Sequence, residues 1–313
     1  LKFFVRVDLI DNAKLVIQNN LDQHRNEIIE GSFPLEYLEI DFLIKKSAIN
    51  IHMGVWIDIS HLWNNPEDTT YACSEKCAEE YKILSMSVED ILDNKDVDII
   101  LNLTNPTAHY QTIKNTLNSG KHSYCEKPLS ITFEQGEELF NLANSKKLYL
   151  GNAPDTFLGG GGQLTKNIIE SGKVGEINLG KFIFAFPGLE PWHPNPEPWY
   201  KEGGGPVLDM GPYFYTMLVN LLGPAKNVRS FPSTISKYRK IGIGPKKGTE
   251  FKVEVPTTYN IIIEFESGSI IHGFLSFDVI NHQTNHMEFY GTKGSIIGPD
   301  PNMFGGPIKI SLT

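Results

Sequence analysis

The chain has 313 residues, 40% of them hydrophobic, and a formal net charge of −9 at pH 7. A chain of this length usually forms more than one hydrophobic core, so we expect two domains. The acidic balance and the lack of a Lys- or Arg-rich run argue against nucleic acid or an anionic membrane surface as a partner, and no apolar stretch is long enough to span a membrane.

The first 70 residues allow several assignments. Three segments, 1–10, 37–44 and 49–60, could each form a strand, and the segment 12–31 could form a helix. These residues therefore define no clear order of elements.

The cysteines of the chain are Cys73, Cys77 and Cys125. An odd and sparse set is typical of a reducing compartment rather than of a disulfide framework, so we expect a cytoplasmic protein. Cys73 and Cys77 are four residues apart in a segment that reads as helix, and two thiols on one face could bind zinc. No second pair of ligands follows them, so no metal site is expected.

From residue 74 the pattern becomes regular. A helix is predicted over 74–83, and a short helix follows Ser87, its expected N-cap, with Asp90 three residues later. Residues 97–104 form a continuous apolar run that ends in a polar turn, which is typical of a buried parallel strand.

A helix is predicted next over 108–120, closed by Gly120. A short strand begins at residue 122, and a helix over 132–147 leads to another strand over 148–153. Strands that alternate with helices imply right-handed crossovers and a parallel sheet. The sequence therefore predicts a Rossmann-like N-terminal domain of residues 1–125, in which 1–70 are divergent.

The second half has a different pattern. Helices are predicted over 161–175 and 206–223, and strand-rich runs over 178–186, 257–279 and 286–298. Short turn signals, ESGS and GTKGS, interrupt these runs and are typical of hairpins. The fold class is therefore α/β, with a C-terminal α+β domain of residues 126–313 and a mostly antiparallel sheet.

Two turns of the N-terminal half have residues suited to ligand binding. Lys127 follows a predicted parallel strand, and the carboxyl ends of such strands face a ligand crevice. Its neighbour Glu126 could orient the ammonium group or a sugar hydroxyl. At residues 104–106 a strand turns into a helix whose free N–H groups favour a polar or anionic ligand. An ordinary surface lysine, and a plain turn capped by Thr107, are the alternatives.

Three glycines, residues 203–205, precede a predicted helix that carries Asp209 and Tyr213 one turn apart. Glycines let a backbone approach a ligand closely. We expect Thr216, Met217 and Asn220 on the same face as this pair. An aspartate that merely suits the helix dipole is the alternative interpretation.

Together with APDTFLGGGGQ (153–163) and WHPNPEPWY (192–200), these stretches closely resemble the Gfo/Idh/MocA oxidoreductases, from about residue 75 to residue 307. The resemblance implies an N-terminal Rossmann domain for NAD or NADP and a C-terminal domain for a sugar or polyol. It implies hydride transfer at a hydroxyl-bearing carbon. It also implies a homo-oligomer that associates through the open face of the C-terminal sheet.

The resemblance also assigns residues. Lys127 matches the lysine of the family's Glu-Lys-Pro motif, and Asp209 matches the acidic residue of the glycine-led helix. Tyr213 stands where many members have a histidine; a phenol has an ordinary pKa of about 10 and an imidazole about 6.5. The expected catalytic residues are Lys127, Asp209 and Tyr213, the cofactor residues Thr104, Asn105, Pro106, His109, Glu126 and Lys127, and the substrate residues Asp155, Trp192, His193 and Tyr213.

The family's opening motif, G-x-G-x-x-G after a strand, is missing. Residues 1–119 contain only Gly31 and Gly54, and neither lies in such a motif. The family also normally continues with helices beyond the FGGP of residues 304–307. The sequence therefore leaves a second hypothesis, a catalytically impaired remnant that acts as a sugar-binding or oligomerisation module. On either hypothesis we expect weakened NAD(P) binding.

Overall fold

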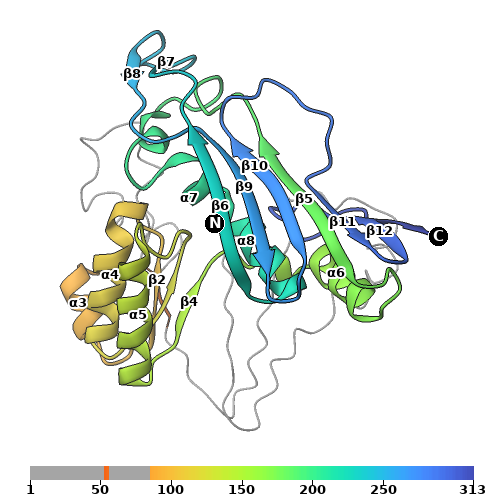
Figure 1. The fold of residues 1–313 in the computed structure, drawn as a ribbon. Helices are drawn as coiled ribbons and strands as arrows, with labels where there is room; N and C mark the ends of the chain where they lie inside the picture. Colours follow the sequence, from red (N-terminus) through yellow and green to blue (C-terminus); the bar gives the residue numbers. More distant parts are fainter. Residues whose placement is uncertain (1–52, 56–84) are drawn as a thin grey trace.

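The computed structural model describes residues 53–55 and 85–313 (Figure 1). The expectations for residues 1–52 and 56–84 fall outside this range. They include the first helix candidate, the helix predicted over 74–83 and the pair Cys73 and Cys77.

The N-terminal sheet has four parallel strands in the order β1-β2-β3-β4. They are β1 (Met53–Val55), β2 (Ile99–Asn102), β3 (His122–Cys125) and β4 (Leu150–Asn152). The predicted parallel pairing of β2 and β3 is confirmed. The buried side chains of this sheet, such as that of Ile100, explain why β2 has an almost continuous apolar sequence.

The described helices that accompany this sheet are α3 (Val88–Asp93), α4 (Pro106–Asn118) and α5 (Phe133–Lys146). The Ser87 side chain accepts a hydrogen bond from the Asp90 N–H at the start of α3, as the sequence predicts. Helix α4 begins two residues earlier than expected because Asn105, not Thr107, is the N-cap. Gly120 follows its C-cap with φ of +81°, which a glycine adopts without strain.

The N-terminal sheet continues past residue 125, because β4 pairs with β3. Buried side chains of α4, α5 and β3, including Ile113, Leu139 and Cys125, form one apolar core. We therefore propose a domain boundary after β4 rather than between residues 125 and 126.

The C-terminal sheet has seven strands in the order β13-β12-β11-β5-β10-β9-β6. All neighbours are antiparallel except β5 and β10, so the sheet is mixed rather than wholly antiparallel. The strands are β5 (Ile177–Ala185), β6 (Ala225–Ser233), β9 (Thr258–Phe265), β10 (Ile270–Ser276), β11 (Met287–Gly291), β12 (Gly294–Ile297) and β13 (Lys309–Leu312).

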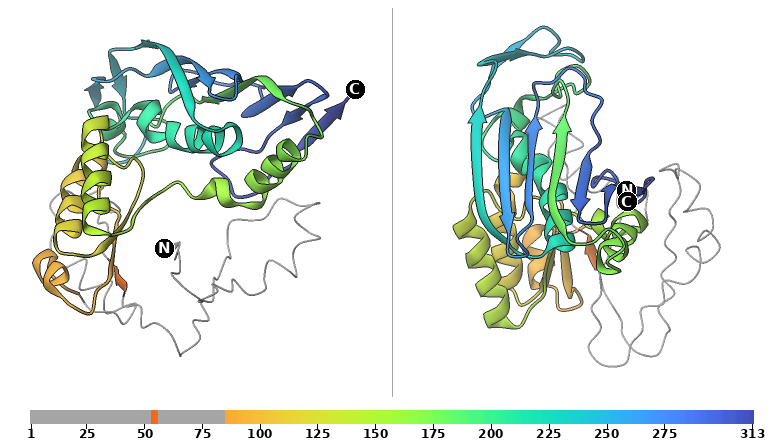
Figure 2. Two further views of the ribbon diagram at one scale, coloured as in Figure 1. Left: turned by 60° about the horizontal axis from the view of Figure 1, so that its bottom comes forward. Right: turned by 45° about the vertical axis from the view of Figure 1, so that its right-hand side comes forward.

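Among the described residues, helices cover one face of this sheet and not the other (Figures 1 and 2). They are α6 (Gly160–Glu170), α7 (Gly205–Asp209) and α8 (Gly211–Leu222). Side chains of α8, such as Phe214 and Leu218, pack with strand residues such as Phe182 and Phe289 in the largest core cluster among the described residues.

The helix predicted over 206–223 is two helices. Helix α7 ends at Asp209, and α8 begins at Gly211 with Pro212 in its first turn, where the missing N–H costs no hydrogen bond. Met217 is fully buried in the core rather than on the face of Asp209 and Tyr213. The sequence does not show this break, because a proline in the first turn of a helix and a proline that bends a continuous helix give the same residue pattern.

A small hairpin, β7 (Tyr238–Lys240) with β8 (Glu250–Lys252), extends from the C-terminal domain. Arg239 anchors it. Its guanidinium lies 2.6 Å from the Glu190 carboxylate, also contacts the Asp278 carboxylate, and donates to the Phe277 carbonyl oxygen at 2.9 Å. The Arg239 side chain is 9% exposed, so this buried charge joins β7, the loop after β5 and the end of β10.

The described residues contain neither a membrane-spanning helix nor a cluster of metal ligands. No helix among them is both long enough and apolar enough to cross a membrane. No three His, Cys, Asp or Glu side chains among them are grouped as metal ligands. Cys125 is a buried free thiol.

Candidate active site

Lys127 lies two residues after the end of β3, and its ammonium group reaches α7. Its Nζ lies 2.8 Å from Asp209 Oδ1 and donates to the Asp209 carbonyl oxygen at 2.7 Å. The Nζ atom is also 5.5 Å from the centre of the Tyr213 ring. The side chains of Lys127 and Asp209 are 14% and 19% exposed. The structure thus brings the three expected catalytic residues into one group, although they are up to 86 positions apart in the sequence.

The glycines before α7 allow its approach to the N-terminal domain. Gly203 and Gly205 have φ of +84° and +81°, where side chains are strained. A Cβ atom on Gly204 would lie 2.6 Å from the backbone of Trp199, and one on Gly203 would lie 3.5 Å from the side chains of Pro106 and Thr107. The glycine run therefore lets the loop pass between Trp199 and the β2–α4 turn, and so places Asp209 beside Lys127.

Opposing effects set the charge state of Lys127. Burial lowers its pKa, but the Asp209 carboxylate and the nearby Tyr213 and Glu126 act in the opposite direction, and the pKa is raised overall. The side chain is therefore an ammonium ion here; a lower pKa, and a base near neutral pH, stays a prediction for the state in which the cationic ring of oxidised NAD(P) lies beside it. The pKa of Tyr213 is raised by burial, against the effect of Lys127, so its phenol stays protonated.

The β2–α4 turn and the loop after β3 lie side by side. The Asn102 side chain accepts hydrogen bonds from the Thr104 N–H at 3.1 Å and from the Thr104 hydroxyl at 2.8 Å. The Glu126 N–H donates to the Asn102 carbonyl oxygen at 2.9 Å. Burial raises the pKa of Glu126, and the Lys127 charge opposes this.

His109 does not offer a ring nitrogen to a ligand, in contrast to its expected place among the cofactor residues. It is 1% exposed. Its Nδ1 lies 2.6 Å from the Pro128 carbonyl oxygen, and its Nε2 lies 2.8 Å from that of Thr104. The ring therefore connects the two loops that carry Thr104 and Lys127.

The residues at this edge fit the nicotinamide end of a dinucleotide. Thr104, Asn105, Glu126 and Lys127 follow the carboxyl ends of two neighbouring parallel strands, where open α/β sheets bind ligands. The segment after β1, where a pyrophosphate loop would lie, is outside the described residues.

The expected substrate residues fall in two places. Asp155 follows β4, and its pKa is raised by burial; its charge acts on the pKa values of Tyr213 and Glu126, which places it near the Lys127 group. Trp192 and His193 lie on the loop between β5 and α7. The His193 ring packs against Trp192 and Trp199, with ring centres 5.6 and 4.7 Å apart. Burial lowers the pKa of His193, so its imidazole stays neutral.

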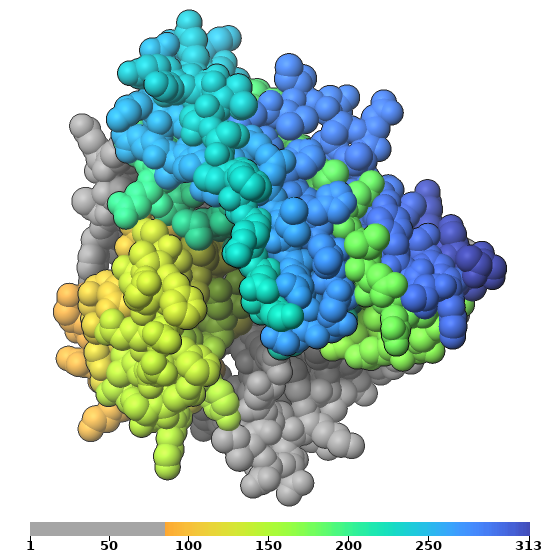
Figure 3. All heavy atoms as spheres, in the orientation of Figure 1, coloured from red at the N-terminus to blue at the C-terminus, as the bar shows by residue number. Residues whose placement is uncertain are grey.

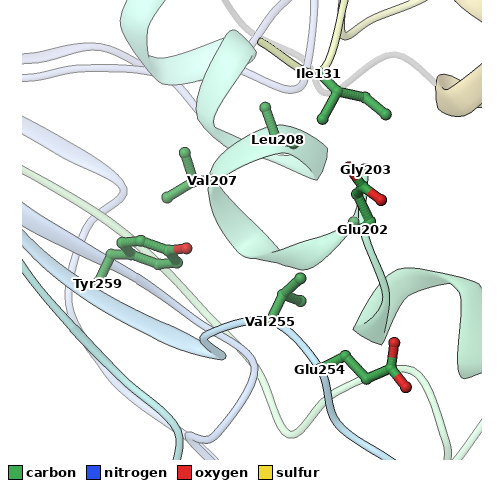
Figure 4. A pocket seen from close by; sticks show the side chains of 9 residues that line it. Ile131, Glu202, Gly203, Val207, Leu208, Glu254, Val255 and Tyr259 are labelled. Atoms are coloured by element: carbon green, nitrogen blue, oxygen red, sulfur yellow. The ribbon is translucent and has the colours of Figure 1, made fainter.

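A cavity of about 370 Å³ beside α7 was not predicted from the sequence (Figure 4). Val207 and Leu208 line it, whereas the next residue, Asp209, contacts Lys127. The cavity therefore lies next to the lysine–aspartate pair and not at it. Residues 202–204, just before α7, also line it. No local pattern marks it, because the other walls come from distant segments, with Ile131, Glu254, Val255 and Tyr259.

Two family models match the chain, one for each domain. Residues 58–153 match the model described as an oxidoreductase family with an NAD-binding Rossmann fold, and residues 163–297 match the Gfo/Idh/MocA C-terminal domain. The chain belongs to the Gfo/Idh/MocA family of oxidoreductases. The expected cofactor, NAD or NADP, agrees with the description of the first model.

Relatives of this family have similar sequences. The chain is 28% identical to 1,5-anhydro-D-fructose reductase of Ensifer adhaerens, over 68% of this chain and 60% of that enzyme. It is 25% identical to dTDP-3,4-didehydro-2,6-dideoxy-alpha-D-glucose 3-reductase of Saccharopolyspora spinosa, over 68% of this chain and 58% of that enzyme. The chain thus spans less than two thirds of the length of both relatives.

The fold is similar to that of levoglucosan dehydrogenase, whose structure was solved with NADH and L-sorbose. The TM-score is 0.64 at 22% identity, over 73% of this chain and 62% of that one. This likeness shows a shared fold, a Rossmann-like domain followed by a domain with a mixed sheet.

Proposed function

We propose that the protein transfers a hydride between NAD or NADP and a hydroxyl-bearing carbon of a sugar or polyol. The observation that carries the proposal is the Lys127–Asp209 pair, 2.8 Å apart and next to the Tyr213 ring, at the carboxyl end of β3. The sugar names of two relatives, 1,5-anhydro-D-fructose reductase and levoglucosan dehydrogenase, support the substrate class. The sparse cysteines favour a cytoplasmic location.

The residues of the site supply the proton chemistry. A bound nicotinamide would accept or give the hydride, with Thr104, Asn105, Glu126 and Lys127 as the residues that hold it. An ammonium group has three N–H donors, and Asp209 accepts from Lys127 at two of its oxygens. The third N–H is available to the substrate oxygen.

The direction of reaction decides which form of Lys127 acts. In reduction, Lys127 gives a proton to the carbonyl oxygen as the carbon gains a hydride. In oxidation, the neutral amine takes the hydroxyl proton as the hydride leaves. Asp209 orients Lys127 in both directions, and the Tyr213 hydroxyl donates a hydrogen bond to the same substrate oxygen.

Calorimetry with NAD⁺ and NADP⁺, followed by absorbance assays with a panel of sugars and polyols, tests this proposal. Loss of two charge-assisted hydrogen bonds to a pyrophosphate, each worth about 1.5–3 kcal/mol, weakens binding by about a hundredfold or more. We therefore expect detectable but weak binding, together with turnover of at least one sugar. No binding and no turnover would favour the remnant, which the missing G-x-G-x-x-G supports.

Tyr213→Phe should reduce turnover less than loss of Lys127. The change removes a hydroxyl for which the described residues provide no hydrogen-bond partner, and it leaves the Lys127–Asp209 pair in place. We expect a loss of about 1 kcal/mol of transition-state stabilisation, which is about fivefold in rate. Steady-state kinetics of both variants would measure this. Abolished turnover in Tyr213→Phe would make the tyrosine the principal proton carrier.

The protein should form a dimer or a larger oligomer through the open face of the C-terminal sheet. Figure 3 shows the side chains of β5, β6, β9 and β10 on this face. Phe231 is 72% exposed and Ile262 is 48% exposed; both line a hollow of about 310 Å³ that also includes His272. Contiguous apolar residues on an exposed sheet face are typical of an interface.

Sedimentation measures this assembly. We expect Ile262→Glu to shift a dimer towards monomer at micromolar concentration, because it places a charge in the apolar contact. Phe140→Glu is the matched control, since Phe140 is an exposed apolar residue of α5 in the N-terminal domain. A monomeric wild-type protein at this concentration would contradict the prediction.

A further inference from the structure

The polar groups around Lys127 offer a ligand many acceptors and few donors. Among the described residues, the Asp155 carboxylate has no partner side chain. Glu126 uses only one carboxylate oxygen, Oε2, which accepts from the Lys127 N–H at 3.0 Å. Among the described residues, the donors left over are one N–H of Lys127 and the hydroxyl of Tyr213. The carboxylates of Glu126 and Asp155 are half-buried and still reach water, so a bound ligand that displaces this water has to bring hydrogen-bond donors of its own.

Asp155 belongs to this group because its segment leaves the sheet beside that of Lys127. Cys125 at the end of β3 is in register with Asn152 at the end of β4. The Asn152 side chain donates to the Glu126 carbonyl oxygen at 3.0 Å, and the Ala153 N–H donates to that of Cys125 at 2.9 Å. Residues 126–127 and 153–155 therefore emerge side by side. Burial of the Asp155 carboxylate, which raises its pKa, makes an additional negative charge nearby costly.

The described residues of this group hold no cation that could bind an anion. Lys127 is paired with Asp209, and the buried His109 has both ring nitrogens against backbone carbonyls. Tyr213 stands where many family members have a histidine, and a phenol cannot carry positive charge. Among the described residues, the carboxyl groups of Asp209 and Glu126 thus lie close to Lys127, whose charge Asp209 neutralises, and that of Asp155 lies near Glu126 and Tyr213.

We propose that this group selects a substrate that is neutral or positively charged next to its reacting carbon, and that it excludes carboxylates and phosphates there. Vicinal hydroxyls, or the ammonium group of an amino sugar, supply the donors that Asp155 and Glu126 lack. Asp155 can accept from two neighbouring hydroxyls at once, so it is the residue that determines this specificity. The inference rests on the proposed function, since it concerns the substrate of the same site.

Chemical modification of Lys127 measures the charge of its surroundings without cofactor or substrate. The probes are N-acetoxysuccinimide, which is neutral, and its ring-sulfonated analogue, which is an anion; both acetylate amines. The readout is the ratio of the two rate constants at Lys127, obtained by peptide mass spectrometry. The exposed Lys309 of β13 provides the reference ratio in the same digest.

We expect the neutral reagent to be favoured at Lys127 by about tenfold relative to Lys309, because nearby carboxylates repel the anion. Asp155→Asn, which keeps the shape and removes the charge, should reduce this preference by about threefold. Glu254→Gln is the matched control. It removes an equal charge from the cavity on the other side of α7 and should leave the ratio unchanged.

Equal ratios at Lys127 and Lys309 would overturn the inference. If neither reagent modifies Lys127, because it is paired with Asp209 and largely buried, the comparison of ligands that follows decides. A second experiment compares the melting temperature of the protein with three added sugars. D-glucuronate should raise it less than D-glucose or D-glucosamine, and the inference would be overturned if D-glucuronate raised it most. If the protein transfers a hydride but the rate ratios at Lys127 and Lys309 are equal, the charge selection is refuted and the proposed function stands. If the ratio at Lys127 is large but the protein does not bind NAD(P), the proposed function is refuted and the charge selection stands.

Discussion

Replacing Lys127 by alanine should lower turnover by at least about 100-fold, the lower end of what a general acid or base contributes. The variant loses the one amine that contacts Asp209 and lies over the Tyr213 ring. Without it, the described residues offer the substrate oxygen no ammonium group from which to take a proton and no amine to which to give one. Steady-state kinetics in both directions would measure the loss, with circular dichroism to show that the fold is intact.

The matched control for Lys127→Ala is Lys201→Ala. Lys201 also pairs with a carboxylate, Glu197, at 2.7 Å, but 46% of its side chain is exposed. We expect turnover close to that of the wild type. If Lys127→Ala kept normal turnover and Tyr213→Phe abolished it, the two roles would be exchanged. If neither variant changed the rate, the site would be elsewhere.

The raised pKa of Lys127 also sets the pH dependence of the two directions. Oxidation needs the neutral amine, so its rate should rise from neutral to alkaline pH. Reduction needs the ammonium form, which is present below the raised pKa, so its rate should stay level until alkaline pH and then fall. Rate profiles in both directions would show this opposition, and an oxidation rate that does not change with pH would contradict it.

Arg239→Met should lower the free energy of unfolding by about 3–5 kcal/mol. The change keeps an apolar stem and removes the charge that Glu190 and Asp278 share. Both carboxylates would then stay partly buried without their cation, which is costlier than losing the attraction itself. Urea unfolding followed by circular dichroism would measure the difference.

Two comparisons test the cause of this loss. Lys226→Met removes an exposed partner of Glu264, and exposed pairs contribute at most about 1 kcal/mol. The triple variant Arg239→Met, Glu190→Gln, Asp278→Asn removes the stranded charges and should recover part of the stability. A single variant as stable as Lys226→Met would show that the Arg239 charge has no such effect.

Local signals predicted the helices and strands that the structure describes over residues 85–153. Ser87 and Gly120 mark the ends of their helices through hydrogen bonds and φ values that involve only neighbouring residues. The parallel pairing of β5 with β10 could not be predicted in this way, because it joins strands about 90 residues apart and depends on the whole sheet. The break at Met210 likewise depends on tertiary packing.

The residues that resemble the family motifs predicted which side chains form the candidate site. The sequence did not predict the charge state of Lys127 within it. Lys127 and Asp209 are 82 residues apart, so no sequence pattern gives the separation of their charges. The sign of the Lys127 pKa shift follows from that separation. His109 was also predicted to bind the cofactor. The sequence does not show that this ring is buried between two carbonyl oxygens, because one of them belongs to the loop after β3.

Lys127 and Asp209 belong to different halves of the molecule. The lysine follows β3 of the four-stranded sheet, whereas the aspartate ends a helix that packs on the seven-stranded sheet. A rotation that separates the two sheets would also separate the ammonium group from the carboxylate. Separation would remove the contributions of Asp209 and Tyr213 that raise the pKa of Lys127, and it would also expose the ammonium group to water. Only when the two halves are closed are Lys127, Asp209 and Tyr213 held as one group.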